Sequence, residues 1–170
     1  MYPAIAATAA VLLLVAGCGG GGKKAPASAT VAGPGFTFAT PVGWRATVAA
    51  SQASAVPPEG GETLVSVSVF RLVKPYRSEL WPKVVPELDR VTAELAGRLR
   101  AKLDASRTVT VSAEQARQYD LSFSHGGKDV RERITFLLLG RQEYELLCRW
   151  AAGTSEPAAC AGLLASFTPA

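Results

Sequence analysis

"SHGGKDVRERITFLLLGRQEYELLCRW", residues 124–150, is the stretch that decides the fold of this chain of 170 residues. Gly126 and Gly127 supply the positive φ angles that a tight hairpin turn requires. Alternating apolar side chains then predict a strand from Asp129, and a turn at residues 140–142 leads into a further strand. Consecutive strands joined by tight turns pair antiparallel. The stretch therefore predicts an antiparallel sheet.

The sequence before this stretch predicts further strands. Phe36 and Phe38 share one face of a short strand, which we expect to pair with the following strand through a tight turn at residues 41–43. Residues 51–62 are rich in proline and glycine, which predicts a loop. The segment "TLVSVSVFRL", residues 63–72, predicts a strand whose valines face one side, while its mixed opposite face is expected to be only partly covered.

A long helix is predicted next, between about Pro86 and Lys102. Its apolar stripe consists of Val84, Leu88, Val91, Leu95, Leu99 and Leu103. The opposite face is charged, with basic residues interleaved with acidic ones. Residues 107–124 then read as one strand with a disturbance near residues 113–115, before the hairpin described above.

A second helix is predicted at the C-terminal end. Apolar side chains recur at helical spacing from Cys160 to Phe167, Ser155 is a candidate N-cap, and Pro157 suits the first turn. The predicted order is therefore three strands, a long helix, three strands and a helix. This order defines an α+β fold, in which an antiparallel β-sheet packs with a long central helix and a C-terminal helix.

The N-terminal segment has the character of a secretion signal. Residues 4–16 are apolar or small and carry no charge, and the run is shorter than the roughly 20 residues that a helix needs to cross a bilayer. Its length and position are typical of the apolar part of a signal peptide, which is removed after export.

Val15-Ala16-Gly17-Cys18 resembles the lipobox of bacterial lipoproteins. The resemblance implies cleavage before Cys18, attachment of a diacylglyceryl group to its sulfur, and anchoring at the outer face of the cell membrane. The alternative is a buried thiol near an ordinary N-terminus. The lipobox instead divides the chain into a signal peptide (1–17), a lipidated cysteine with a flexible tether rich in glycine, alanine, serine and proline (18–34), and a single α+β domain (35–170).

The other two cysteines predict a structural disulfide. With Cys18 assigned to lipid, Cys148 and Cys160 remain as an even pair in an oxidising compartment. Cys148 lies on the apolar face of its strand and Cys160 on the apolar face of the last helix, and a short reversal at residues 153–155 brings the two together. A redox-active pair is the alternative, but CxxC spacing is absent.

The segment "FTFATPVGW", residues 36–44, resembles the start of PsbP-like domains. The later helix, the late hairpin and a C-terminal helix ending in "LLASFTP" extend this resemblance over about residues 35–168. It implies an α+β sandwich. Members of this fold group are mainly non-catalytic assembly factors, binding modules or envelope lipoproteins, so the resemblance carries no functional residues onto this chain.

The candidate chemical residues are few. His125, the only histidine, lies in a glycine turn, where exposure to solvent is the simplest expectation. Without a second histidine or clustered cysteines, no zinc or copper site is predicted, and no cofactor is implied. Glu132 shares the parity of apolar neighbours, so it either lies at an exposed strand end or points inward and needs a partner. Glu143 and Glu145 share the outward parity of Arg149, which is typical of solvated cross-strand pairs.

The charge pattern favours no nucleic-acid partner. The formal net charge is +4, and the basic residues are scattered along the chain. A basic set on and after the long helix is a candidate for contact with anionic lipids or teichoic polymers. A solvated helix face accounts for it better, because acidic side chains are interleaved. The set consists of Arg90, Arg98, Arg100, Lys102 and Arg107, and the acidic side chains are Glu87, Asp89, Glu94 and Asp104.

Three functions follow as hypotheses. The leading one is a membrane-anchored exported lipoprotein whose domain is a non-catalytic binding or assembly-support module of the cell envelope. The second is a carrier, in which the sheet and long helix enclose a hydrophobic ligand in a pocket lined by valine, leucine and phenylalanine. The third is a hydrolase of unknown substrate, which a buried, hydrogen-bonded cluster around His125 or Glu132 would favour.

Overall fold

The computed structural model describes residues 27–170. In chain order, its elements are β1 (Ser28–Gly33), β2 (Phe36–Pro41), β3 (Arg45–Val48), β4 (Gln52–Val56), β5 (Leu64–Arg71), a 3-10 turn (Ser78–Leu80), α1 (Trp81–Leu99), β6 (Lys102–Val111), β7 (Glu114–His125), β8 (Lys128–Leu139), β9 (Gln142–Ala151), α2 (Ala158–Ser166) and β10 (Thr168–Pro169). The predicted α+β class is confirmed.

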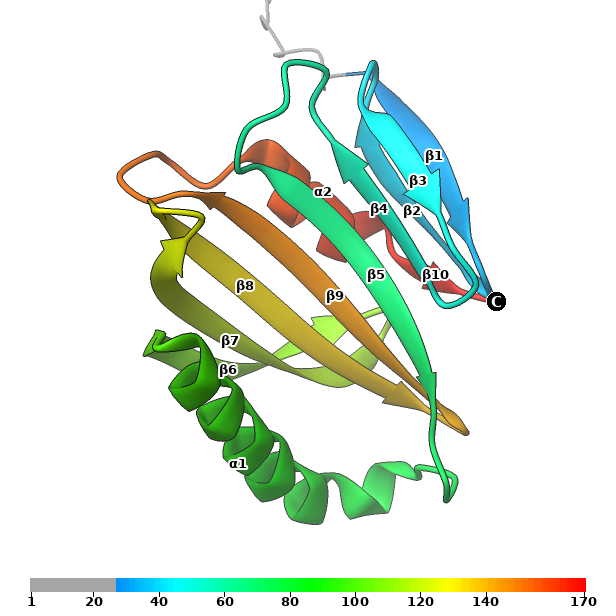
Figure 1. The fold of residues 1–170 in the computed structure, drawn as a ribbon. Coiled ribbons are helices and arrows are strands. Elements are labelled where there is room, and N and C mark those ends of the chain that lie inside the picture. The colour runs from blue at the N-terminus through cyan, green and yellow to red at the C-terminus, as the bar shows by residue number, and fades with distance from the viewer. Residues whose placement is uncertain (1–26) are drawn as a thin grey trace, which may run out of the picture.

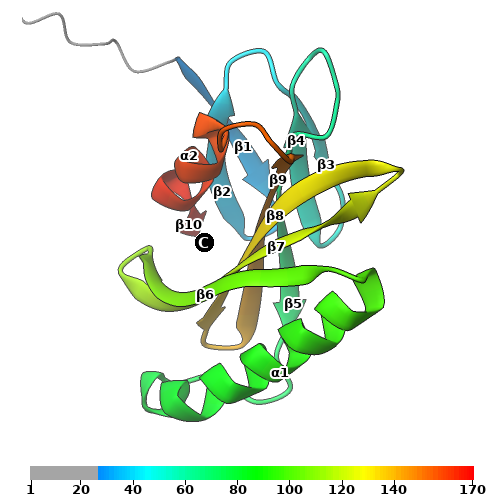
Figure 2. The same ribbon diagram turned by 90° about the vertical axis from the view of Figure 1, so that its left-hand side faces the viewer.

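Two sheets and two α-helices are layered on one another (Figures 1 and 2). The large sheet has seven strands in the order β3-β4-β5-β9-β8-β7-β6, and the small sheet has three in the order β1-β2-β10. All neighbouring strands pair antiparallel. Helix α1 contacts β6 and β7 on one face of the large sheet, whereas α2 and the small sheet cover the other face.

The alternation of side chains along the central strands builds a core on each face of the large sheet. Ile134 and Phe136 of β8 pack with Leu88 of α1 in one cluster. Leu146 of β9 packs with Phe36 of β2 in the other. Both faces are therefore buried at the centre of the sheet, which explains the near-continuous apolar sequence at the end of β8.

The hairpins predicted from glycine are present. Gly126 and Gly127 have φ angles of 58° and 79° and join β7 to β8, and Gly140, with φ of 54°, begins the turn from β8 to β9. The valine face of β5 is also confirmed, since Val65 and Val67 are fully buried. On its other face Phe70 is half exposed, as the mixed pattern predicts.

Part of the segment expected to be a tether forms a β-strand. Residues 28–33 form β1, which pairs along its whole length with β2 and buries Val31. The domain therefore begins before residue 35. Alanine, threonine and valine alternate in this segment, and the single buried side chain gives too weak a period to mark a strand.

Two of the predictions for the region before β5 are wrong. β2 and β3 do not pair across the turn at residues 41–43, because β2 enters the small sheet and β3 the large one. The predicted loop at residues 51–62 contains β4. Its inward residues are Ala53 and Ala55, which are fully buried but carry too little apolar surface to give a strong strand signal.

Residues 107–124 are two strands and not one. β6 ends at Val111, and Ser112 and Ala113 form a two-residue turn in which both φ angles are positive, 50° and 66°. Such turns normally carry asparagine or glycine, so the sequence gives little sign of this one. The Ser112 hydroxyl donates a 2.6 Å hydrogen bond to the Phe167 carbonyl, which anchors the turn against the C-terminal end.

The helices differ from prediction at their starts and in their buried faces. Helix α1 begins at Trp81, so Pro82 lies in the first turn and Pro86 inside the helix. Its buried residues are Trp81, Leu88, Thr92 and Ala96, whereas Val91 and Leu99 are exposed and Leu103 belongs to β6. Helix α2 begins at Ala158 with Pro157, not Ser155, as its N-cap.

Candidate functional site

A disulfide joins β9 to α2. Cys148 and Cys160 are bonded, their Cα atoms lie 5.4 Å apart, and both residues are buried. The pairing predicted from the two apolar faces is thus present in the structure. It fixes α2 against the large sheet, and both sulfurs are kept from solvent. Cys18, the predicted lipidation site, lies outside the described residues.

The two candidate catalytic residues are not brought together. His125 is exposed at the end of β7, and its ring contacts that of Phe123. Glu132 points inward and is 3% exposed. Its partner is Arg149, directly opposite on β9, whose Nε and Nη2 lie 2.7 and 2.6 Å from Oε2 of Glu132. The inward carboxylate therefore belongs to an ion pair.

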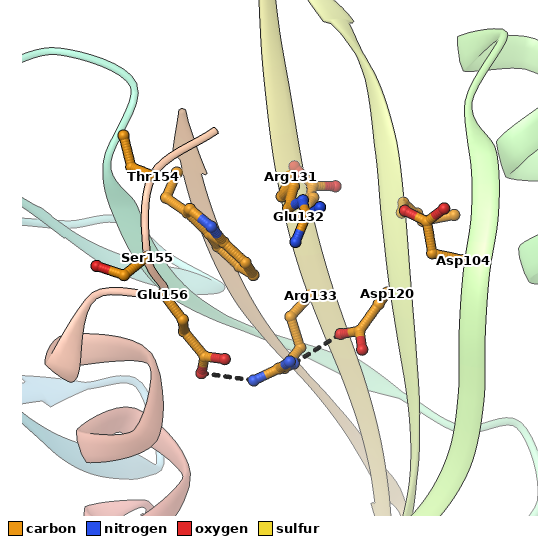
Figure 3. A pocket seen from close by; sticks show the side chains of 10 residues that line it. Asp104, Asp120, Arg131, Glu132, Arg133, Thr154, Ser155 and Glu156 are labelled. Atoms are coloured by element: carbon orange, nitrogen blue, oxygen red, sulfur yellow. Dashed lines mark hydrogen bonds and ion pairs between the residues drawn. The ribbon is translucent and has the colours of Figure 1, made fainter. Parts of the chain in front are cut away.

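A pocket of about 420 Å³ lies where β7, β8 and β9 meet the segment before α2 (Figure 3). We call it the charged pocket. The Arg133 guanidinium spans it, donating to Asp120 at 2.7 Å and to Glu156 at 2.5 Å. Arg107 donates to the other oxygen of Asp120 at 2.8 Å. Trp150 forms one wall, with Arg133 Cζ 5.8 Å from the ring centroid.

Two carboxylates and two guanidinium groups at the charged pocket neutralise one another: Asp120 and Glu156 with Arg133 and Arg107. Burial alone would raise the pKa of Asp120, but hydrogen bonds from Arg133 and Arg107 hold it below its ordinary value. Burial likewise opposes the charge of Arg133, yet the bonds to Asp120 and Glu156 raise its pKa. This network ties the segment before α2 to the sheet. Its evident role is structural.

A second hollow of about 390 Å³ lies between the first half of α1 and the sheet. We call it the α1 groove. Its apolar lining consists of Leu80, Val84, Leu88, Val91 and Leu138, and its charged lining consists of Lys83, Glu87 and Glu143. Phe70 lies beside Glu143 in the register of β5 and β9 and is 49% exposed. This side of the molecule therefore presents apolar surface to solvent.

The solvated cross-strand pairs predicted for Glu143 and Glu145, which lie beside the α1 groove, are not present among residues 27–170. Glu143 and Glu145 have the outward parity expected, but they are partly buried and form no ion pair within residues 27–170. Arg149, which shares their parity on β9, binds Glu132 of β8. Burial raises the pKa of Glu143, and burial together with the charges of Glu132 and Glu143 raises that of Glu145.

The charged face of α1 is largely as predicted. Arg90 forms ion pairs with Glu87 and Glu94, and Arg98 forms one with Glu94. Acidic neighbours thus balance these basic residues along the helix, as the interleaved charges predict. Arg100 caps the helix in a left-handed conformation, and the Lys102 ammonium pairs with Asp104 on β6.

Asp89 is the exception, because it faces the sheet. Its carboxylate accepts hydrogen bonds from Arg117 at 2.9 Å and from the Tyr119 hydroxyl at 2.7 Å. Burial and the bond to Asp89 raise the pKa of Tyr119 to about 12. The partner residues lie some thirty positions away on β7, so only the folded chain shows this contact. It clamps α1 onto the sheet.

Within residues 27–170, no group of three or more histidine, cysteine or acidic side chains is placed to hold a metal ion. Over the same residues, neither helix combines the length and apolar character needed to cross a bilayer.

Comparisons with known proteins identify the fold. No family model matches the sequence, and no curated protein sequence does either. Cyanobacterial PsbP (CyanoP) from Synechocystis sp. PCC 6803 is similar in structure, with a TM-score of 0.58 and 11% identity over 92% of this chain and 99% of that one. A protein from Bacteroides thetaiotaomicron VPI-5482 has a TM-score of 0.56 and 13% identity over 80% of this chain and 45% of that one.

The chain has a PsbP-like α+β fold. The resemblance noted over residues 35–168 is confirmed at the level of fold, and at these identities the likeness extends no further. The chain spans less than half the length of the Bacteroides protein. Neither comparison bears on the lipobox.

Proposed function

We propose that this protein is an exported lipoprotein whose PsbP-like domain is a non-catalytic binding or assembly-support module of the cell envelope. The observation that carries the proposal is the α1 groove, where exposed apolar surface lies beside carboxylates that have no ion-pair partner among residues 27–170. Exposed apolar surface beside polar groups is typical of interaction sites. In this proposal the lipid on Cys18 holds the domain at the outer face of the cell membrane.

The state of the cysteines supports export. A disulfide such as Cys148–Cys160 persists in an oxidising compartment and is rare in the cytosol. Cys18 then has a separate role, as the lipid-bearing residue of the sequence Val15-Ala16-Gly17-Cys18. Lipidation of one cysteine and pairing of the other two leaves no reactive thiol.

The placement of the polar residues supports a binding role over hydrolysis. Glu132 is engaged by Arg149, and His125 lies exposed at a hairpin end. A general base must reach the proton that it removes, and a nucleophile must lie beside its base. Neither residue makes a hydrogen bond to the other or to a serine hydroxyl in the described chain.

The proposal is tested by crosslinking and affinity capture from intact cells, comparing wild type with Cys18→Ala and Val91→Asp. Val91 lines the α1 groove and is 46% exposed, so its substitution should leave the fold intact. We expect wild type to crosslink to an envelope protein at the membrane. Cys18→Ala should release the domain from the membrane, and Val91→Asp should stay there but lose the crosslink. Capture that is indifferent to both changes would refute the proposal.

A carrier of a hydrophobic ligand is the second candidate function. The apolar lining of the α1 groove favours it, since leucine and valine from α1 face Leu138 of β8 there. Solvent extraction of protein purified from cells, followed by mass spectrometry, tests it directly. A lipid recovered in equal molar amount from wild type and absent from Val91→Asp would support the carrier over the binding module.

A further inference from the structure

Glu143 and Glu145 lie in an apolar setting that the strand register creates. In the pairing of β9 with β8, Glu143 stands opposite Leu138 and Glu145 opposite Phe136. On the other side, Glu143 stands opposite Phe70 of β5. Apolar side chains therefore flank Glu143 on both neighbouring strands, whereas Glu145 has Phe136 on one side and Ser68 on the other. Helix α1 lies over Glu143.

This setting leaves the negative charges without compensation. Removing a carboxylate from water is costly unless a cation or hydrogen-bond donors replace the lost hydration. Neither glutamate forms an ion pair or side-chain hydrogen bond among residues 27–170. The charged pocket shows the contrast, because there every buried carboxylate is engaged by arginine.

The other charged groups around the α1 groove do not supply the missing cation. From α1, Glu87 is engaged by Arg90, and Lys83 stands exposed at the rim. From the sheet, Arg149 is bonded to Glu132, whose own charge acts on Glu145. The groove thus combines an apolar lining with an excess of negative charge.

We propose that the α1 groove binds a cationic amphipathic segment of a partner protein. The apolar side chains of that segment pack on Leu80, Val84 and Val91. A lysine or arginine side chain of the segment is placed against the Glu143 and Glu145 carboxylates. A fatty acid or phospholipid fits this surface less well, because its anionic head group would be repelled by the same carboxylates. The inference rests on the proposed binding role of the domain but not on its lipid anchor.

Binding is measured by fluorescence anisotropy with a labelled helical peptide of leucine and lysine, amphipathic in pattern. The protein is used as isolated from cells, in nanodiscs of zwitterionic lipid, with empty nanodiscs as the blank. A peptide with glutamate in place of each lysine is the matched control. We expect the lysine peptide to bind and the glutamate peptide not to bind.

Variants locate the site. The double variant Glu143→Gln/Glu145→Gln should weaken binding by at least about tenfold, and Val91→Asp should weaken it similarly. Glu59→Gln, at an exposed loop position, should leave binding unchanged. Thermal unfolding of each variant separates loss of binding from loss of fold, and the glutamine variant is expected to be no less stable than wild type.

Three outcomes would overturn the inference. The first is equal binding of the lysine and glutamate peptides, and the second is unchanged peptide affinity in a double variant that is folded. The third is displacement of the peptide by monomeric dodecyltrimethylammonium that binds with the same affinity, which would assign the groove to a small hydrophobic cation. None of them bears on Cys18. Failure of membrane localisation in the capture experiment would instead count against the anchored lipoprotein and leave the groove as described.

Discussion

At the scale of single residues, the Glu132–Arg149 ion pair defines what the inward carboxylate does. Glu132 is almost fully buried, and its partner lies on the adjacent strand in direct register. Arg149 also stands 5.8 Å from the ring centroid of Phe123. A buried charge held by a directly opposed partner is a structural element of the sheet, because it stabilises the fold only while both members are present.

Glu132→Gln should destabilise the domain by about 3 kcal/mol, because it leaves the Arg149 guanidinium partly buried without a counter-ion. The measurement is urea-induced unfolding at pH 7. The double variant Glu132→Leu/Arg149→Met is the control, and it should recover most of the loss because no uncompensated charge remains. A change below about 1 kcal/mol for Glu132→Gln would contradict a structural role for the pair.

Glu143 and Glu145 should give the domain a pH-dependent weakness. Their folded-state pKa values are raised above the ordinary 4.5. The protonated carboxyls therefore contribute stability that is complete below pH 4.5 and is lost as the pH rises through the folded-state values. Glu143→Gln/Glu145→Gln should match wild type near pH 4 and exceed it at pH 7, as measured by thermal unfolding across this range. A stability difference that is constant with pH would rule out this account.

The parity of these three glutamates could be predicted from sequence, but their partners could not. Alternation along β8 and β9 places Glu132 on one face and indicates that it needs a partner. Which arginine supplies that partner depends on the register of two strands separated by a turn, and burial of Glu143 depends on where α1 crosses the sheet. The same holds for Asp89, whose partners on β7 are brought to it only by packing.

At the scale of elements, strands with clear turn residues and clear apolar periodicity were predicted correctly. Strands without these sequence signals were missed, each for an identifiable reason. The Gly126–Gly127 hairpin and the valine strand β5 carry clear turn and periodicity signals. By contrast, β4 buries only alanines, and the β6–β7 hairpin uses Ser112 and Ala113 at positive φ. The bond from Ser112 to Phe167, 55 residues away, supports that turn, and a local pattern does not encode such a contact.

Pro86 lowers the stability of helix α1. Proline inside a helix removes one hydrogen bond and crowds the preceding turn, and Pro86 is exposed, so no packing depends on it. Pro86→Ala should stabilise the domain by about 1–3 kcal/mol. Pro82→Ala is the matched control and should give no such gain, since a proline in the first turn costs little. Chemical denaturation checks both, and equal effects would contradict the helix start at Trp81.

Strand β1 should be required for stability. Deleting residues 1–34 removes all the pairing of β1 with β2 and exposes the apolar surface that Val31 covers. The expected loss is at least about 2 kcal/mol from the valine alone. Deleting only residues 1–26, which keeps β1, is the control. Equal urea midpoints for the two truncated proteins would place β1 outside the folding unit.

At the scale of the whole molecule, the two faces of the large sheet have different roles. One face is covered by α2 and the small sheet, with the disulfide joining α2 to β9, and Arg133 of the charged pocket is paired with Asp120 and Glu156. On the other face, helix α1 covers only part of the sheet (Figure 1). The α1 groove lies between α1 and the sheet there. The proposed binding role therefore rests on the α1 groove.

The disulfide should contribute a substantial part of the stability of the sealed face. Cys148 and Cys160 close a loop with a sequence separation of 12 residues, for which the chain-entropy model gives about 3 kcal/mol. Reduction should therefore lower Tm by roughly 10 °C. Calorimetry with and without reductant measures the shift, with Cys148→Ser/Cys160→Ser as the control that reductant does not affect. An unchanged Tm on reduction would contradict the stabilising role.

The proposed place of this protein in the cell envelope requires export, a lipid on Cys18 and a disulfide between Cys148 and Cys160. Intact-mass analysis of the protein from fractionated cells tests this most directly. We predict a membrane-fraction species that begins at Cys18, carries a diacylglyceryl group on that residue, and has the mass of a bonded Cys148–Cys160 pair. A full-length, unacylated chain with three free thiols, recovered from the cytosolic fraction, would contradict it.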